Sequence, residues 1–198
     1  MKRSRFLLFL GILALSLFAL NIAPGQKPAS AAAGAMAYKL DGAHTSVYFR
    51  ITHLGMSFIY GRFNNVSGRI AVGDDSTFDF SVKTADIDTN HAKRDNHLRS
   101  PDFFNARQFP TITFKSTEVH GHGEEIQVTG DLTLHGVNRE ISFHMKKMGE
   151  GSDPWGNERI GFATEFTIKR SNFGMTKMLN VVGDDVDLMI SFEGIRGG

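Results

Sequence analysis

The sequence predicts an all-β protein: an eight-stranded antiparallel barrel with a short helical insertion between its third and fourth strands. Three observations indicate this class. Short segments alternate apolar and polar residues with a period of two, which is typical of strands buried on one face only. Turns rich in glycine, asparagine and aspartate separate these segments. The alternation is interrupted over residues 91–108, where helical signals replace it.

The strands are predicted from the positions of their apolar residues. The first places Val47, Phe49 and Ile51 on one face, and their neighbours are polar or amphipathic. The seven that follow show the same spacing: Ile70 and Val72; Phe78, Phe80 and Val82; Ile112 and Phe114; Ile126, Val128, Leu132 and Leu134; Ile141, Phe143 and Met145; Ile160, Phe162, Phe166 and Ile168; Val186, Leu188, Ile190 and Phe192. Short turns imply antiparallel neighbours. Of the two ways to bury eight such faces, a sandwich and a barrel, the barrel is preferred because closure removes exposed strand edges.

The helical insertion is predicted from capping residues. Asn90 can accept amide protons at the start of a helix over residues 91–100. The Ser-Pro-Asp sequence at residues 100–102 is typical of a second helical start. Phe109 and Pro110 then return the chain to an extended path, because proline restricts the residue before it. An insertion of this length can cover one mouth of a barrel, so we interpret it as a two-part lid.

The first 37 residues have the features of a secretory signal peptide followed by a spacer. A basic start precedes 15 uncharged, mostly apolar residues from Phe6 to Leu20, which is short for a membrane span. Two Ala-x-Ala cleavage signals follow, at residues 29–31 and 35–37. We therefore expect residues 1–37 to direct export to the periplasm and residues 38–198 to form one domain. An uncleaved amino-terminal anchor is the alternative.

The charge of the predicted mature chain disfavours nucleic-acid binding. Residues 1–37 contain four of the 22 basic residues and no acidic residue, which leaves 18 basic and 21 acidic residues and a net charge of −3. Without an overall positive field, a nucleic-acid partner is not expected. The chain has no cysteine, so disulfides and thiolate metal sites are excluded. The fold must depend on its apolar core, in which phenylalanine is abundant.

No cluster of residues predicts catalysis or a metal site. His91 and Asp95 are four residues apart, but they supply two ligands where zinc takes three or four. His120 and His122 flank a glycine at a predicted turn, where histidine is ordinary. No serine lies in the G-x-S-x-G turn of a nucleophile elbow. We therefore expect no catalytic residue, no metal and no cofactor.

The alternation alone does not decide what fills the barrel. Eight strands enclose a space just wide enough to be filled by side chains or to hold one small ligand. A solid barrel would act as an interaction or stress-response module, whereas a hollow one would bind an apolar ligand. His53 shares the inward side of Val47 and Ile51, so it is either a hydrogen-bonded core histidine or a contact for a ligand's head group.

Several segments resemble the YceI-like family of periplasmic polyisoprenoid-binding proteins. The resemblance covers residues 38–195 and is most specific in DTNHAKRDNHLRSPDFFNARQFPTITF, residues 88–114. The other similar segments are DGAHTSVYFRITHLGMSFIYGRF, GDLTLHGVNREISF, DPWGNERIGFATEFTIKRSNFGM and VGDDVDLMISFEG. Asn172 departs from the aspartate that many members have before Phe-Gly.

This resemblance implies a lipocalin-like barrel that binds a long isoprenoid lipid, such as a polyprenyl chain or an isoprenoid quinone. It implies a carrier and not an enzyme, in transient contact with a membrane and either monomeric or homodimeric. An enzyme acting on such a lipid and a solid-core module are the alternatives. The residues expected to line the apolar cavity are Phe49, Ile51, Phe58, Phe103, Phe104, Phe114, Phe143, Phe162, Phe166 and Ile168. His53, Arg94 and His97 are expected near the head group.

Overall fold

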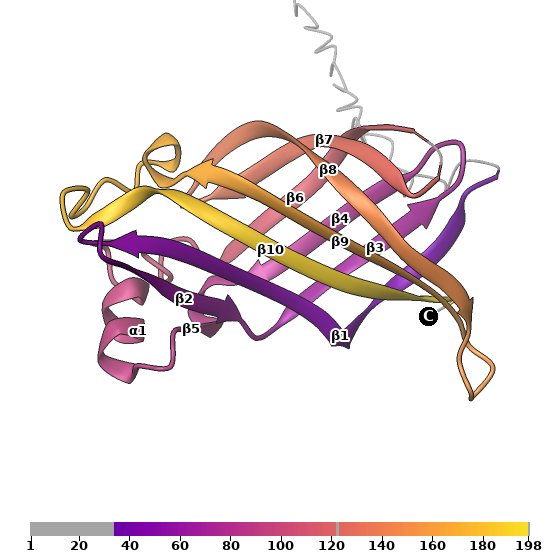
Figure 1. Cartoon of the computed structure of the whole chain (residues 1–198), viewed down its shortest axis with the longest axis horizontal. Coiled ribbons are helices and arrows are strands. Elements are labelled where there is room, and N and C mark those ends of the chain that lie inside the picture. The colour runs from indigo at the N-terminus through magenta and orange to yellow at the C-terminus, as the bar shows by residue number, and fades with distance from the viewer. Residues whose placement is uncertain (1–33, 122, 198) are drawn as a thin grey trace, which may run out of the picture. The chain divides into compact units, whose positions relative to one another are not determined.

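Antiparallel strands make up most of the computed structural model, which describes residues 34–121 and 123–197 (Figure 1). The strands are β1 (Met36–His53), β2 (Ser57–Phe63), β3 (Val66–Val72), β4 (Thr77–Lys83), β5 (Ile87–Asp88), β6 (Thr111–His120), β7 (Glu125–Leu134), β8 (Val137–Ser152), β9 (Glu158–Lys169) and β10 (Val182–Arg196). Helix α1 spans Ala92–Arg99, and short 3-10 turns, η1 and η2, span Thr84–Asp86 and Arg170–Phe173. Residues 1–33 of the predicted leader lie outside the described residues.

Pairing between the first and last strands closes the sheet into a barrel. The order of neighbours is β10-β9-β8-β7-β6-β4-β3-β1-β2-β5, and β1 also pairs antiparallel with β10. The first residues of β1 pair with β3 and its last residues pair with β2. Because β2 and β3 share one position beside β1, and β5 has only two residues, the barrel has eight strand positions. The predicted fold class is confirmed.

The first strand is longer than the alternation predicts. It starts at Met36, which pairs with Val72, and it has a register shift between Asp41 and Ser46. This irregularity lies where β1 exchanges β3 for β2 as its neighbour. The sequence there is polar and contains Gly42, and residues 42–45 of β1 stand opposite residue 192 of β10 alone, so the period-two signal is lost at a bulge.

The predicted insertion lies between β4 and β6, the third and fourth strand positions, but its details differ. The residue that caps α1 is His91 and not Asn90. The His91 backbone is extended, and its Nδ1 atom accepts the Arg94 N–H at 3.2 Å. Asn90 has a left-handed backbone with φ of 58°, which places its side chain outside the capping position. Within the described residues, no helix is long and apolar enough to cross a membrane.

The predicted second helix, beginning at residues 100–102, is wrong. Residues 101–104 form consecutive turns after α1 ends at Arg99. The Phe104 N–H donates to the Leu98 carbonyl at 2.9 Å and the Ala106 N–H donates to the Arg99 carbonyl at 3.0 Å. These bonds fold the segment back on α1, so the insertion is one helix followed by a compact loop.

One end of the barrel interior is packed solid. The rings of Phe78, Phe162 and Phe192 lie 5.4–6.3 Å apart between centroids and are each at most 2% exposed. Ile70 and Ile160 are buried beside them. Burying one such side chain stabilises a fold by about 1.5–3 kcal/mol. The packed end therefore supplies much of the apolar stabilisation, and the other end can remain hollow.

Candidate ligand-binding cavity

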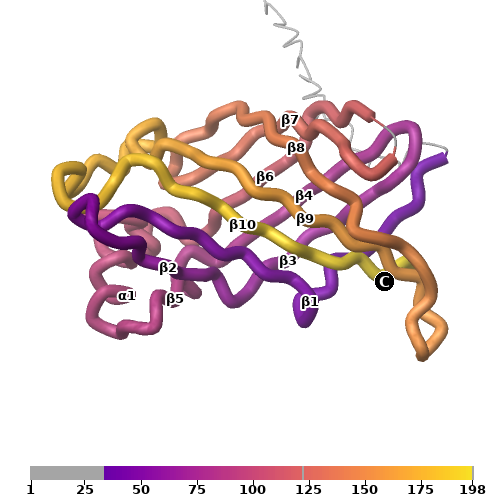
Figure 2. Tube along the Cα trace, in the orientation of Figure 1, coloured from indigo at the N-terminus to yellow at the C-terminus, as the bar shows by residue number. Residues whose placement is uncertain are grey.

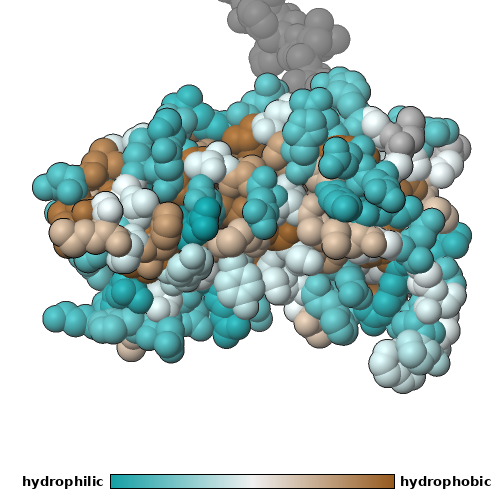
Figure 3. Space-filling model, in the orientation of Figure 1, coloured by the Kyte–Doolittle hydropathy of each residue, from teal (hydrophilic) through white to brown (hydrophobic). Residues whose placement is uncertain are grey.

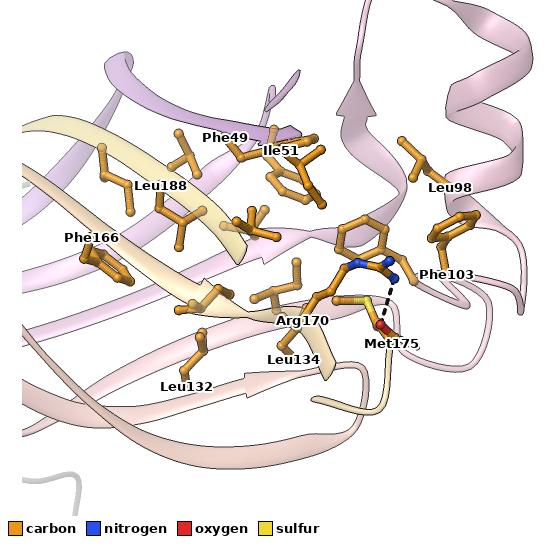
Figure 4. A pocket seen from close by; sticks show the side chains of 18 of the residues that line it. Phe49, Ile51, Leu98, Phe103, Leu132, Leu134, Phe166, Arg170, Met175 and Leu188 are labelled. Carbon is orange, nitrogen blue, oxygen red and sulfur yellow. Dashed lines mark hydrogen bonds between the residues drawn. The ribbon is translucent and has the colours of Figure 1, made fainter. Parts of the chain in front are cut away.

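The other half of the barrel contains an apolar cavity of about 380 Å³, which is within the usual range for small-ligand pockets (Figure 4). Side chains from separate strands face this common space: Phe49 and Ile51 from β1, Leu132 and Leu134 from β7, Phe166 from β9 and Leu188 from β10. A wall of this kind favours an extended hydrocarbon and offers few partners to a polar solute.

Aromatic rings close the inner end of the cavity. Phe80 and Phe192 line the cavity and lie 4.9 Å apart between ring centroids. Phe192 also belongs to the packed end, through its contact with Phe162. These rings therefore form a floor that separates the hollow half from the packed end.

All but two of the predicted cavity residues line this pocket. They are Phe49, Ile51, Phe103, Phe104, Phe114, Phe143, Phe166 and Ile168. Phe143 and Phe166 stack with 8° between their rings and 4.4 Å between centroids. Their contact with a ligand stays a prediction.

The inward position expected of Phe58 is wrong. Phe58 pairs with Thr52 across β1 and β2, so it shares the outer face of the barrel. The guanidinium of Arg50 lies 4.8 Å from the centre of its ring. Ile59, the next residue, lines the cavity instead. The turn between the two strands sets which residues face inward, and residue type alone does not reveal it.

Phe162 points into the barrel as predicted, but the prediction that it lines the cavity is wrong. Its side chain points into the barrel and is 2% exposed. It lies in the packed end, beside Phe78 and beyond the floor formed by Phe80 and Phe192. Alternation identifies the inward face of a strand but not the distance along the barrel axis.

Helix α1 and the loop after it lie at the hollow end of the barrel, and Leu98, Phe103 and Phe104 line the cavity. The helix is tied to the barrel through Asp95, whose side chain is buried. The Asp95 carboxylate accepts the Thr89 N–H at 2.9 Å and the Thr89 hydroxyl at 2.5 Å. Arg99 adds hydrogen bonds to the Ala85 and Ile87 carbonyls at 2.6 and 2.8 Å.

The three predicted head-group residues, His53, Arg94 and His97, also line the cavity. Arg94 donates to the hydroxyl and the carbonyl of Thr89, both at 2.7 Å. His97 hydrogen-bonds to Asp102 at 3.0 Å, which lowers the pKa of the Asp102 carboxyl. These groups form a small polar area in a wall that is mostly apolar. Whether they contact a ligand stays a prediction.

Arg170 is a cavity residue that the sequence analysis missed. It is 3% exposed, and burial lowers the pKa of its guanidinium. The guanidinium donates to four backbone carbonyls, at 2.8 Å to Gly183 and Met175 and at 2.9 Å to Lys177 and Val182. Figure 4 shows the bond to Met175. All four acceptors belong to the segment 175–183, so Arg170 fixes the loop that leads into β10. None of these acceptors carries a formal charge.

The alternation contained a signal for Arg170. Phe166 and Ile168 both point inward, and Arg170 is the next residue with the same parity. An arginine on the inner face at a strand end marks either a buried ion pair or a functional group. The loop residues Met175, Met178 and Val181, which also line the mouth, lie outside any strand and give no periodic signal.

A charged cluster lies away from the cavity, at the packed end. Asp41, His44 and Glu193 bring one potential ligand atom each within 4.8 Å of the others. Arg159 donates to Asp41 at 2.7 Å, to Glu193 at 2.9 Å and to Asp153 at 2.7 Å. The hydrogen bonds from Arg159 and His44 lower the pKa of Asp41 to about 2. This ion-pair network links β1, β9 and β10 where the barrel closes.

A model of the YceI-like domain matches residues 38–194. The chain belongs to the YceI-like family. A UPF0312 protein of Pseudomonas aeruginosa (strain LESB58) is 44% identical over 165 residues, covering 80% of this chain and 86% of that protein. Protein YceI of Escherichia coli O157:H7 is 42% identical with the same coverage.

Solved YceI-like structures share the barrel. The Campylobacter jejuni YceI protein is 31% identical, with a TM-score of 0.67 over 74% of this chain and 90% of that one. A polyisoprenoid-binding domain from Saccharophagus degradans is 17% identical, with a TM-score of 0.66 over 81% of this chain and 99% of that one. At 17% identity, the second comparison shows the fold alone.

Proposed function

We propose that this YceI-like protein is an exported, non-enzymatic carrier that encloses the chain of an isoprenoid lipid. The apolar pocket of about 380 Å³ is the main support. Moving apolar surface out of water stabilises a complex by about 25 cal/mol per Å², or roughly 0.8 kcal/mol for each methylene-sized group. A five-carbon isoprene unit therefore contributes about 2–3 kcal/mol before ordering costs. The ligand class named for the Saccharophagus domain is apolar and supports this proposal.

We further propose that the head group stays at the mouth, near His53, Arg94, His97 and Arg170. Specificity in apolar pockets generally comes from a few polar groups that fix orientation. The buried guanidinium of Arg170 donates to four backbone carbonyls, and the Asp184 carboxylate nearby offsets part of its charge, so the remaining positive potential favours a polar or anionic head group. A quinone ring and a phosphate both satisfy this requirement.

Filling the cavity tests this function. Leu188→Trp adds a ring to the pocket, and the steric cost of about 1–3 kcal/mol for overpacking corresponds to a roughly 5- to 150-fold loss of lipid affinity. Lipid bound to the purified protein is extracted with organic solvent and identified by mass spectrometry. Added isoprenoid is titrated into the delipidated protein.

The matched control is Met189→Trp. Met189 follows Leu188 on β10, pairs with Tyr48 and Glu165, and is absent from the cavity wall, so lipid uptake should stay at the wild-type level. Absence of co-purifying lipid from the wild-type protein, together with no uptake of added isoprenoid, would show that the carrier function is wrong.

We propose that export removes residues 1–31. Of the two Ala-x-Ala signals, cleavage at the second would remove Met36 and Ala37, which pair with Val72 and Ala71 in the barrel. Cleavage after Ala31 leaves β1 complete. Intact-mass measurement of the exported protein should give a chain beginning at Ala32. A chain beginning at Tyr38 would contradict the cleavage site, and an uncut chain would contradict the signal peptide.

A further inference from the structure

We propose that the mouth of the barrel docks on a lipid bilayer through two apolar loop tips. The first tip is the β1–β2 turn, with Leu54 and Met56, and the second is the loop before β10, with Met178 and Leu179. We call these four residues the mouth rim. The Leu54 N–H donates to the Val181 carbonyl at 2.8 Å, so the tips form one edge, which Figure 2 shows at the same end as α1.

The mouth rim is strongly exposed for apolar side chains. Met56 is 85% exposed and Leu54 is 51% exposed, and Figure 3 shows hydrophobic atoms reaching the surface at this end. Single exposed apolar residues are common, but contiguous ones usually mark an interaction site. Met178 belongs both to the rim and to the cavity wall, so the exposed surface continues into the pocket.

The composition of the two tips favours a bilayer as the occupant. Residues 54–61 and 178–183 contain no aspartate, glutamate, lysine or arginine. Charged side chains are costly at membrane depth, whereas leucine and methionine are readily accommodated there. Tips without charge can therefore enter the apolar boundary of a bilayer without burying an ion.

Aromatic and basic residues surround the first tip on the outer face of the barrel. Arg50 pairs with Tyr60, and Tyr48 pairs with Arg62, across β1 and β2. The Phe58 ring lies 6.3 Å from that of Tyr60. Tyrosine and arginine are typical of the head-group region of membranes, because an apolar body carries a polar end.

Insertion of apolar side chains, and not net charge, should provide most of the binding. Arg50 contacts Asp187 at 2.8 Å and Arg62 contacts Asp88 at 3.5 Å, so both basic groups are partly neutralised. Binding should then occur on uncharged phosphatidylcholine and should resist salt, because screening weakens only charge interactions.

The proposed carrier function explains why the rim lies beside the opening of the cavity, and the docking inference rests on it in this respect. An isoprenoid chain that crossed water to reach the pocket would expose its apolar surface. A mouth inserted in the bilayer lets the chain move from one apolar environment to another. The exposed Phe58, beside the first tip, then has a role outside the cavity.

Flotation with phosphatidylcholine vesicles tests the proposal. The Met56→Asp plus Leu179→Asp variant should bind these vesicles roughly tenfold less than the wild-type mature protein. The matched control is Met148→Asp plus Trp155→Asp, which replaces residues 62% and 81% exposed on the β8–β9 hairpin, at the opposite end of the barrel (Figure 1). This control should bind vesicles as the wild type does, in low salt and in 0.5 M NaCl as an order-of-magnitude screening condition.

Three results would overturn docking: equal loss of binding in the two variants, binding that disappears at high salt, or self-association through the rim without vesicle binding. Uptake of isoprenoid delivered from dilute ethanol separates docking from the carrier function. A wild-type protein that takes up this lipid but ignores vesicles overturns docking alone. Rim-dependent vesicle binding without lipid uptake supports docking and contradicts the carrier.

Discussion

Replacing Arg170 with methionine is expected to lower the free energy of unfolding by about 2–4 kcal/mol, since four backbone carbonyls lose their donor. The guanidinium connects the end of β9 to the segment 175–183, and it is almost fully buried. Methionine fills a similar volume but donates no hydrogen bond. Urea denaturation of the delipidated protein measures the effect without a contribution from ligand.

Lys169 provides the control for this substitution. It precedes Arg170, points outward and contacts Asp185 at 2.6 Å through an exposed side chain. Exposed ion pairs contribute little, so Lys169→Met should leave the urea midpoint nearly unchanged. Equal midpoints for Arg170→Met and the wild type would show that the loop is held by other contacts.

Replacing Asp95 with alanine is expected to detach the lid. Its carboxylate is the acceptor for both polar hydrogens of Thr89, and the loss of a charged acceptor in a buried site costs about 1.5–3 kcal/mol. Hydrogen exchange at the amides of residues 92–104 should accelerate before that of the packed end. Lipid should leave the Asp95→Ala variant faster than the wild type, because Leu98 and Phe103 no longer cover the cavity.

Two further variants separate charge from helix stability. Asp95→Asn keeps an acceptor oxygen, so its exchange rates should fall between those of the wild type and Asp95→Ala. Lys93→Ala changes an exposed residue of the same helix and should leave exchange unchanged. If Asp95→Ala exchanges and releases lipid like the wild type, α1 is anchored mainly by Arg94 and Arg99.

Alternation predicted the long strands well because each has one face inside and one outside, as Phe166 and Ile168 show on β9. It misplaced Phe58, because the geometry of the β1–β2 turn fixes the register. A local sequence pattern does not indicate how far along the barrel axis a residue lies. It therefore could not distinguish Phe162, in the packed end, from the residues of the cavity. The cap of α1 was missed because Asn90 adopts a left-handed backbone and His91 takes its role.

The surroundings of Arg170 could be predicted only in part from the local sequence. Its parity with Ile168 indicates an inward side chain, but its partners come from a loop whose path depends on the whole fold. The exposure of the rim residues could not be predicted from the sequence pattern either, since Leu54 and Met178 both have left-handed backbones in turns without periodicity.

The floor formed by Phe80 and Phe192 closes the binding site toward the packed end. On the proposed carrier function, a bound lipid chain would have no exit through the packed end. Such a protein cannot serve as a conduit through which lipid flows from a donor at one end to an acceptor at the other. Delivery would require donor and acceptor both to reach the hollow half of the barrel.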